Sequence, residues 1–241
     1  MRLLSGLVLT LIAVVSAAAE TTEKAPGGAH AVLAAAAAEA VAYGDTRFAF
    51  TLDHWSEQNG EELALRLRFD PRKARGEQWS LLNGSKDDLS KNQKKAFKQI
   101  QKTTNPDDAL VYDRLGDELG NVVLVEETAE IAKFKAPVVD DELPPDALEM
   151  TVTLDKTAGY VSQIDVRALK PFKPAAVAKI KSMTQSQTYV VPDGGGFAML
   201  QTSENEVAGK AMLKSFTSHS RQTYSDIVPI DPSELPPADA D

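Results

Sequence analysis

The sequence predicts an α+β protein, an antiparallel β-sheet of long strands that is covered by a few helices. Apolar and polar residues alternate through several stretches, which is the period of a strand with one buried and one polar face. Short loops join consecutive stretches, and such loops connect antiparallel strands, because a parallel crossover needs about a dozen residues or more. Only a few segments lack the alternation and have helical composition instead.

The first residues, 1–19, have the features of a cleavable signal peptide. Arg2 gives a positive start, Leu3–Val15 is an apolar run, and Ala17–Ala19 fits the small-residue cleavage rule. The run is short for a bilayer span, and no other stretch is long and apolar enough to cross. We therefore predict a periplasmic protein with no transmembrane span in the mature chain. The alternative is an N-terminal membrane anchor.

Residues 20–44 are predicted to form a flexible lead-in followed by an alanine-rich helix. The lead-in contains Pro26, Gly27 and Gly28, whereas Ala29–Tyr43 is dominated by alanine, the best helix former. Small side chains let such a helix lie close against a sheet. Residues 45–229 are then predicted to be a single antiparallel-sheet domain, since that length is ample for one core.

The sheet domain begins with two clearly alternating runs, Thr46–Trp55 and Leu63–Phe69. A turn at Asn59-Gly60 separates them, which predicts an antiparallel pair. Trp79 and Leu81 are interpreted as part of a third strand.

Helical segments then interrupt the strands. Asp87–Lys102 has its apolar residues along one stripe and its lysines elsewhere, which predicts a surface helix with Phe97 turned inward. Ser85 or Asp87 is the expected N-cap. A second short helix is predicted within Asp107–Leu119.

Strands resume at Val122–Val125 and Thr128–Lys135, followed by a proline-rich acidic loop, Ala136–Pro145, that we expect to cross the edge or face of the sheet. Leu148–Ile227 is interpreted as an antiparallel meander. Within it, Asp155–Gly159 joins two alternating runs and predicts a hairpin.

The rest of the meander is less regular. Val177–Val191 could begin as a helix, but a hairpin turn at Pro192–Gly196 needs a strand on each side, so one long strand is predicted. Phe197–Thr202 and Val207–Thr217 are predicted to be the last pair. Residues 230–241 are acidic and proline-rich, and we predict a disordered tail.

Composition excludes several classes of protein. The chain has 241 residues, a formal net charge of −9 and an isoelectric point near 4.9, which argues against binding nucleic acid. It contains no cysteine, which excludes disulfides, thiolate zinc sites, cysteine nucleophiles and lipid attachment at an N-terminal cysteine.

The sequence offers no convincing catalytic constellation. Its three histidines, His30, His54 and His219, have no spacing that makes a metal site, although the last two could meet in space. There is no Gly-x-Ser-x-Gly nucleophile motif, and Gly194–Gly196 lacks the lysine of a phosphate loop. The acidic pairs, such as Asp107-Asp108, are expected in solvent-exposed loops. We therefore predict no catalytic residue, no metal and no cofactor, and a protein that is not an enzyme.

The apolar residues of the first two strands are the candidate ligand-binding residues, because a curved sheet can leave part of its apolar face open to a ligand. The alternative is that this face is simply core. The candidates are Phe48, Phe50, Leu63, Leu65, Leu67 and Phe69.

The order of elements resembles the fold of the periplasmic lipoprotein carrier LolA and its relatives. The segments that carry the resemblance are Phe48–Leu52, Leu63–Leu67, the turn Asp155–Gly159, and Gly209–Ala211. The resemblance implies that the predicted sheet is a curved antiparallel β-sheet half-barrel, which is closed by helices around an apolar hollow. The acidic charge, the Ala136–Pro145 insertion and the acidic tail depart from that pattern.

Two functions are compatible with these observations. The first is an exported, non-catalytic periplasmic binding or carrier protein for a lipid, lipoprotein or other amphiphile. The second is a cell-envelope interaction or assembly factor, which would have a protein partner, a filled core and no small ligand.

Overall fold

The computed structural model describes residues 28–43, 46–103, 106–112, 115, 122–138, 143–144, 146–175, 178–192, 196–212 and 214–236. The predicted signal peptide, almost all of the predicted lead-in and the last five residues of the predicted tail lie outside these ranges.

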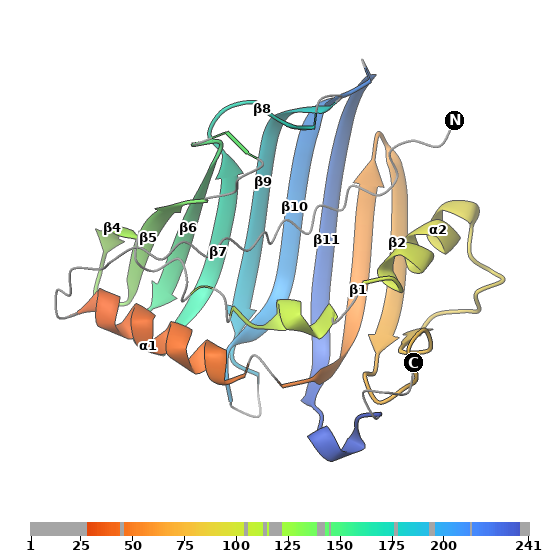
Figure 1. Ribbon diagram of the computed structural model, residues 1–241, viewed down its shortest axis with the longest axis horizontal. Helices are drawn as coiled ribbons and strands as arrows, with labels where there is room; N and C mark the ends of the chain where they lie inside the picture. Colours follow the sequence, from red (N-terminus) through yellow and green to blue (C-terminus); the bar gives the residue numbers. More distant parts are fainter. Residues whose placement is uncertain are drawn as a thin grey trace.

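The described residues form one eleven-stranded sheet with two α-helices and two short 3₁₀ helices (Figure 1). The strands are β1 (Phe48–Gln58), β2 (Glu61–Phe69), β3 (Trp79–Leu81), β4 (Val123–Glu127), β5 (Ile131–Pro137), β6 (Leu148–Asp155), β7 (Tyr160–Ala168), β8 (Phe172–Ala175), β9 (Ala178–Val190), β10 (Met199–Ala211) and β11 (Lys214–Pro229). The helices are α1 (Ala29–Ala42), α2 (Lys91–Ile100), η1 (Pro106–Leu110) and η3 (Pro232–Glu234).

The strand order is β3-β2-β1-β11-β10-β9-β7-β6-β5-β4, and β8 pairs with β9 outside this path. Every pair is antiparallel. The sheet is curved and not closed into a barrel, because β3 and β4 stand at its two ends. The predicted α+β class with a curved antiparallel sheet is confirmed. The hairpin at Asp155–Gly159 and the single long strand β9 are confirmed as well.

The two faces of the sheet have different surroundings. Residues that oppose each other in antiparallel strands project to the same face, so the pairing assigns each side chain to a face. The face that carries Phe50, Leu67 and Phe134 also packs against α1, η1 and α2, and we call it the helix face. The opposite face is called the open face. Figure 1 shows α1 across one end of the sheet and α2 beside β2, and no described helix crosses the other end of β9, β10 and β11.

Helix α1 lies close to the sheet because its buried side chains are mostly alanine. Leu33, Ala36 and Ala40 are at most 1% exposed, and they belong to the same apolar cluster as the strand residues of the helix face. The ring of His30 meets the ring of Phe134 edge to face, with centroids 5.0 Å apart. These contacts explain why an alanine-rich segment docks here.

Helix α2 is shorter than the sequence predicted, and the predicted N-caps were wrong. The helix begins after Ser90, whose hydroxyl accepts a hydrogen bond from the Gln93 backbone N–H, while the Gln93 side chain accepts one from the Ser90 backbone N–H. This reciprocal capping box outcompetes a cap at Ser85 or Asp87, because it satisfies two free N–H groups at once. Phe97 is 4% exposed, so the predicted inward face of the helix is confirmed.

The predicted last pair of strands was also wrong. Met199–Ala211 is one continuous strand, and it pairs with Lys214–Pro229 rather than with a segment beginning at Val207. The polar run Ser203–Glu206 lies within the strand because its side chains alternate between two partly exposed faces. The chain reverses at Met212, whose φ of 46° is in the left-handed region that tight turns require.

Gly209 is required where β10 bends against β9. A Cβ at this position would lie 2.5 Å from the carbonyl oxygen of Lys179 and 2.9 Å from the ring of Phe216. The strand pairing also shifts between Ala208 and Gly209. A residue without a side chain therefore lets the two backbones approach.

An ion pair fastens η1 to the start of β1. The guanidinium of Arg47 donates two hydrogen bonds to the Asp107 carboxylate, at 2.6 and 2.7 Å, and the backbone N–H of Phe48 donates a third at 2.9 Å. The hydrogen bonds of its guanidinium to Asp107 raise the pKa of Arg47. Asp107 is 1% exposed, so the expectation of a solvent-exposed acidic pair is wrong for this residue. Within the predicted helix Asp107–Leu119, the described residues include part of η1 and the helical residue Leu115, and residues 113, 114 and 116–119 lie outside the described ranges.

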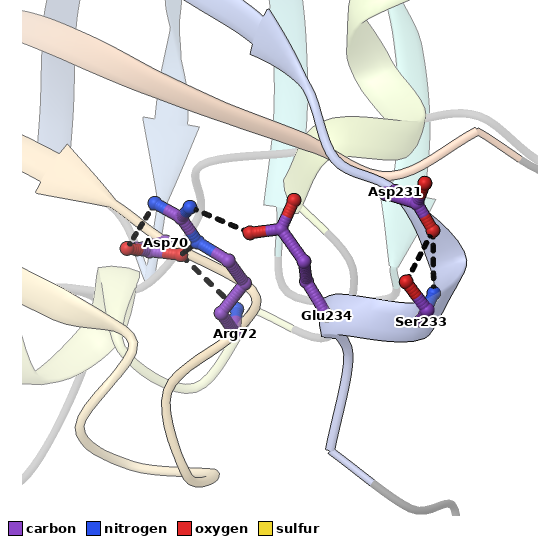
Figure 2. Close-up of polar contacts among 5 residues, drawn as sticks. All are labelled: Asp70, Arg72, Asp231, Ser233 and Glu234. Carbon is purple, nitrogen blue, oxygen red and sulfur yellow. Dashed lines mark hydrogen bonds and ion pairs between the residues drawn. The ribbon is translucent and has the colours of Figure 1, made fainter.

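The described part of the acidic tail contains the helix η3. The carboxylate of Asp231 caps it by accepting hydrogen bonds from the N–H and hydroxyl of Ser233, as Figure 2 shows. Glu234 pairs with Arg72 at 3.0 Å, and Arg72 also holds Asp70. These contacts fasten residues 231–234 to the loop that follows β2.

Candidate functional site

The candidate residues of β1 and β2 all project to the helix face. Phe48, Phe50, Leu65, Leu67 and Phe69 are at most 5% exposed, and Leu63 is half-buried at the edge of the same cluster. Most of these side chains pack against one another. Leu65 is the only one of the six that lines a pocket described below, so its role in binding stays a prediction.

The centre of the helix face is polar. Two adjacent rows of side chains, which we call the polar rows, cross β9, β10, β11 and β1 in directly paired positions, over about 14 Å at the usual strand spacing. The first row is Gln187, Ser203, Gln222 and His54, and the second is Gln185, Asn205, Ser220 and Ser56.

Apolar residues end both polar rows. On β7, Ile164 and Val166 pair with the two glutamines of β9. On β2, Leu65 pairs with His54 and Leu63 pairs with Ser56. The helix face is therefore polar at its centre and apolar at its two sides. An amphiphile, which has a polar and an apolar part, could contact both kinds of surface.

Two atoms of the polar rows are buried without a hydrogen-bond partner in the described residues: Nδ1 of His54 and Oδ1 of Asn205. Leaving a buried polar atom unsatisfied destabilises a fold by roughly 1–3 kcal/mol. Groups of this kind are uncommon in folded proteins, and they point to a partner that satisfies them.

A pocket of about 350 Å³ lies at the β2 end of the first polar row. Its walls include His54 and Leu65 from the helix face, and Leu81, Leu89 and Gln93 from β3 and the α2 region. The remaining lining residues are Asp53, Trp55, Ala64, Arg66, Asn83, Arg221 and Thr223. Gln93 also ties α2 to β2, because its side-chain amide donates to the Ala64 carbonyl at 3.1 Å. The volume is within the range of small-molecule sites, about 300–1,000 Å³. The pocket thus joins three leucine side chains to the polar row and to the charged residues Asp53, Arg66 and Arg221.

His54 is neutral at physiological pH. The side chain is 6% exposed, and burial lowers the pKa of its imidazole from the ordinary value of 6.5. Burial has this effect because the charged form loses its hydration. The pocket therefore presents a neutral imidazole, which can donate from one ring nitrogen and accept at the other.

The burial of His54 predicts a pH dependence of folding. The unfolded chain binds a proton at His54 more readily than the folded chain, so this contribution to stability is present above the unfolded pKa and is lost as pH falls below it. Between about pH 7.5 and pH 5 the loss from this one group is at most about 2 kcal/mol. Urea unfolding at both pH values should therefore show a smaller loss for His54→Gln than for the wild type. Equal losses would contradict the assignment.

His54 and His219 do not share a site, because they project to opposite faces. His219 pairs with Glu57 on the open face, where its Nε2 lies 2.8 Å from Glu204 and its ring meets Trp55 edge to face. Among the described residues, no group of three or more histidine, aspartate and glutamate side chains is arranged to hold a metal.

Sequence reasoning missed the polar rows, although the sequence contains a signal for them. Uncharged polar residues recur at every second position in Gln185-x-Gln187, Ser203-x-Asn205 and Ser218-x-Ser220-x-Gln222. Such spacing places each set on one face of its strand. The pairing of β1 with β11 was still needed to place His54 and Ser56 in the same rows.

Neither α1 nor any other helix in the described residues has the length and hydropathy to cross a membrane.

No protein-family model matches the chain, and no curated protein or solved structure matches it significantly.

Proposed function

We propose that this protein is an exported, non-catalytic periplasmic binding or carrier protein for an amphiphile, such as a lipid or a lipoprotein. One observation carries the proposal: a pocket that contains the side chains of Leu65, Leu81 and Leu89 lies directly beside half-buried polar rows. An amphiphile needs both surfaces, the first for its acyl chain and the second for its head group.

The pocket can supply the affinity for an acyl chain. Leu65, Leu81 and Leu89 contribute apolar surface from three different parts of the chain. An acyl segment that lost about 100 Å² of contact with water would gain roughly 2.5 kcal/mol, before the losses of freedom on binding are subtracted. The pocket alone therefore supports weak binding of the chain, and contacts of the head group must add to it.

Export is supported by the order of features at the N-terminus: Arg2, the apolar run and the alanines before Glu20. The likeness of the element order to the LolA carriers points in the same direction. Intact mass of protein recovered from the periplasm tests this part of the proposal, and a chain that still begins at Met1 would contradict it.

Amphiphile binding is tested by displacement of a fluorescent fatty-acid probe from the purified protein. We expect saturable binding, and we expect Leu65→Gln to weaken it about tenfold, because an amide in the pocket wall removes apolar surface. Val125→Gln is the matched control, since Val125 is 49% exposed on β4 at the far edge of the sheet, and the probe should bind this variant as it binds the wild type. Absence of saturable binding would overturn the proposal.

A second candidate function is assembly with another envelope protein. It is favoured by the edge strand β4, where Val123 and Val125 are 63% and 49% exposed and one row of backbone groups faces no described strand. An edge of this kind can pair with a strand from a partner. Loss of a stable partner in pull-downs with Val123→Lys, together with no probe binding by the wild type, would support this function instead.

A further inference from the structure

The polar rows differ in charge from the surface behind them. Their eight side chains are three serines, three glutamines, one asparagine and one histidine, and none of them is a carboxylate, a lysine or an arginine. On the open face of the same strands, Glu204, Glu206 and Arg221 occupy the intervening positions. The chain therefore places its charges on one face and keeps the centre of the helix face uncharged.

The unsatisfied atoms in the polar rows require partners of two kinds. Oδ1 of Asn205 can only accept a hydrogen bond, while Nδ1 of His54 donates or accepts according to the tautomer. Ser and Gln side chains in the same rows both donate and accept. A hydroxyl group matches all of them, because a single hydroxyl can donate one hydrogen bond and accept others.

We propose that the polar rows bind the uncharged, hydroxyl-rich head group of an amphiphile, a glycosyl group being the nearest chemical class, while its acyl chain enters the pocket between β2 and α2. The inference rests on the proposed function and adds the class of ligand. His54 and Asn205 lie two strand spacings apart, about 10 Å, so a head group of two sugar rings lying across the rows would reach both.

Ionic head groups fit this surface less well. A carboxylate or phosphate over the polar rows would lose hydration without meeting a cation among their eight side chains, and an ammonium group would find no carboxylate among them. The charged residues Asp53, Arg66 and Arg221 belong to the wall of the pocket, where the acyl chain is placed. The net charge of −9 adds a general repulsion of anions. Head-group discrimination is therefore the property that tests the inference.

Three probes with nearly equal alkyl chains, eleven carbons in dodecanoate and twelve in the other two, isolate the head group: dodecyl maltoside, dodecanoate and dodecyltrimethylammonium. Each is titrated below its critical micelle concentration into the purified full chain, in competition with the fluorescent probe. We expect dodecyl maltoside to bind at least about tenfold more tightly than either ionic compound, a difference that two or three net hydrogen bonds provide.

Two substitutions assign the preference to the polar rows. Asn205→Leu and Gln185→Leu should each weaken dodecyl maltoside binding about tenfold, while dodecanoate binding changes less than about twofold, since its chain occupies the pocket alone. Thr184→Val is the control, because Thr184 is the neighbour of Gln185 but projects to the open face. Asn205→Leu also removes an unsatisfied acceptor, so its melting temperature should not fall; a merely structural role of Asn205 would lower it.

The outcomes separate the inference from the proposed function. Equal binding of all three probes, tighter binding of an ionic probe, or no effect of either leucine variant would overturn the head-group inference and leave amphiphile binding in place. No saturable binding of any probe would overturn the proposed function as well. If Asn205→Leu fails to fold, Gln185→Leu at the β9 end of the same row gives the deciding measurement.

Discussion

Replacing Asp107 by Ala is expected to lower the free energy of unfolding by about 4 kcal/mol, because it leaves the Arg47 guanidinium partly buried without its counter-ion. The Asp107 side chain is fully buried and accepts three hydrogen bonds, two from Arg47 and one from the Phe48 backbone. The substitution removes all three and frees η1 from the start of β1. Urea unfolding followed by circular dichroism measures the loss.

The matched control is the exposed pair of Asp53 and Arg66, whose atoms are 3.4 Å apart and whose side chains are 49% and 48% exposed. Asp53→Ala should lower the free energy of unfolding by less than about 1 kcal/mol, because solvent screens exposed pairs. Losses of similar size in the two variants would show that the Arg47–Asp107 contact does not hold η1 in solution.

The sheet could be predicted from the sequence because its signals are local. Leu148–Asp155 alternates buried and half-buried residues along its whole length, and the next strand follows after the loop that ends at Gly159. The alternation of apolar and polar residues and the glycine of the turn can both be recognised within about ten positions of the sequence. The same signals identified β1 and β2, whose side chains pair as the two predicted runs imply.

The sequence was misleading where two local signals competed. Ser203–Glu206 has the composition of a loop, yet it lies inside β10 because both neighbouring strands supply hydrogen bonds to its backbone. At α2, Ser85, Asp87 and Ser90 are all acceptable N-caps by residue type. Only Ser90 has a glutamine three residues later, and the resulting capping box decided the start of the helix.

The candidate site depended on contacts that one sequence does not reveal. Asp107 meets Arg47 across 60 positions, and His54 meets Gln222 only because β1 pairs with β11. The alternation of apolar and polar residues predicts that a strand has two different faces, but it does not identify the distant strand that pairs with it. The apolar candidates of β1 and β2 were therefore found from the sequence, whereas the polar rows next to them required the pairing.

Replacing Phe50 by Ala is expected to lower the free energy of unfolding by about 5 kcal/mol, the upper end of the range for a buried phenylalanine. Phe50 has no exposed surface, and its ring lies 5.2 Å from that of Phe69, 5.6 Å from Trp79 and 5.5 Å from Tyr224, measured between centroids. The substitution leaves a cavity and removes three aromatic contacts, each of which adds to the loss beyond area alone. Urea unfolding at neutral pH measures it.

Phe50→Leu is the conservative comparison, because it keeps most of the apolar volume and should restore more than half of the loss. The pair of variants also separates a core role of Phe50 from a lining role. Phe50 does not line the pocket, so Phe50→Leu should bind dodecyl maltoside as the wild type does, while Leu65→Gln, whose residue lines it, should not. Weakened binding by Phe50→Leu with unchanged stability would place Phe50 in contact with the ligand and contradict a core role.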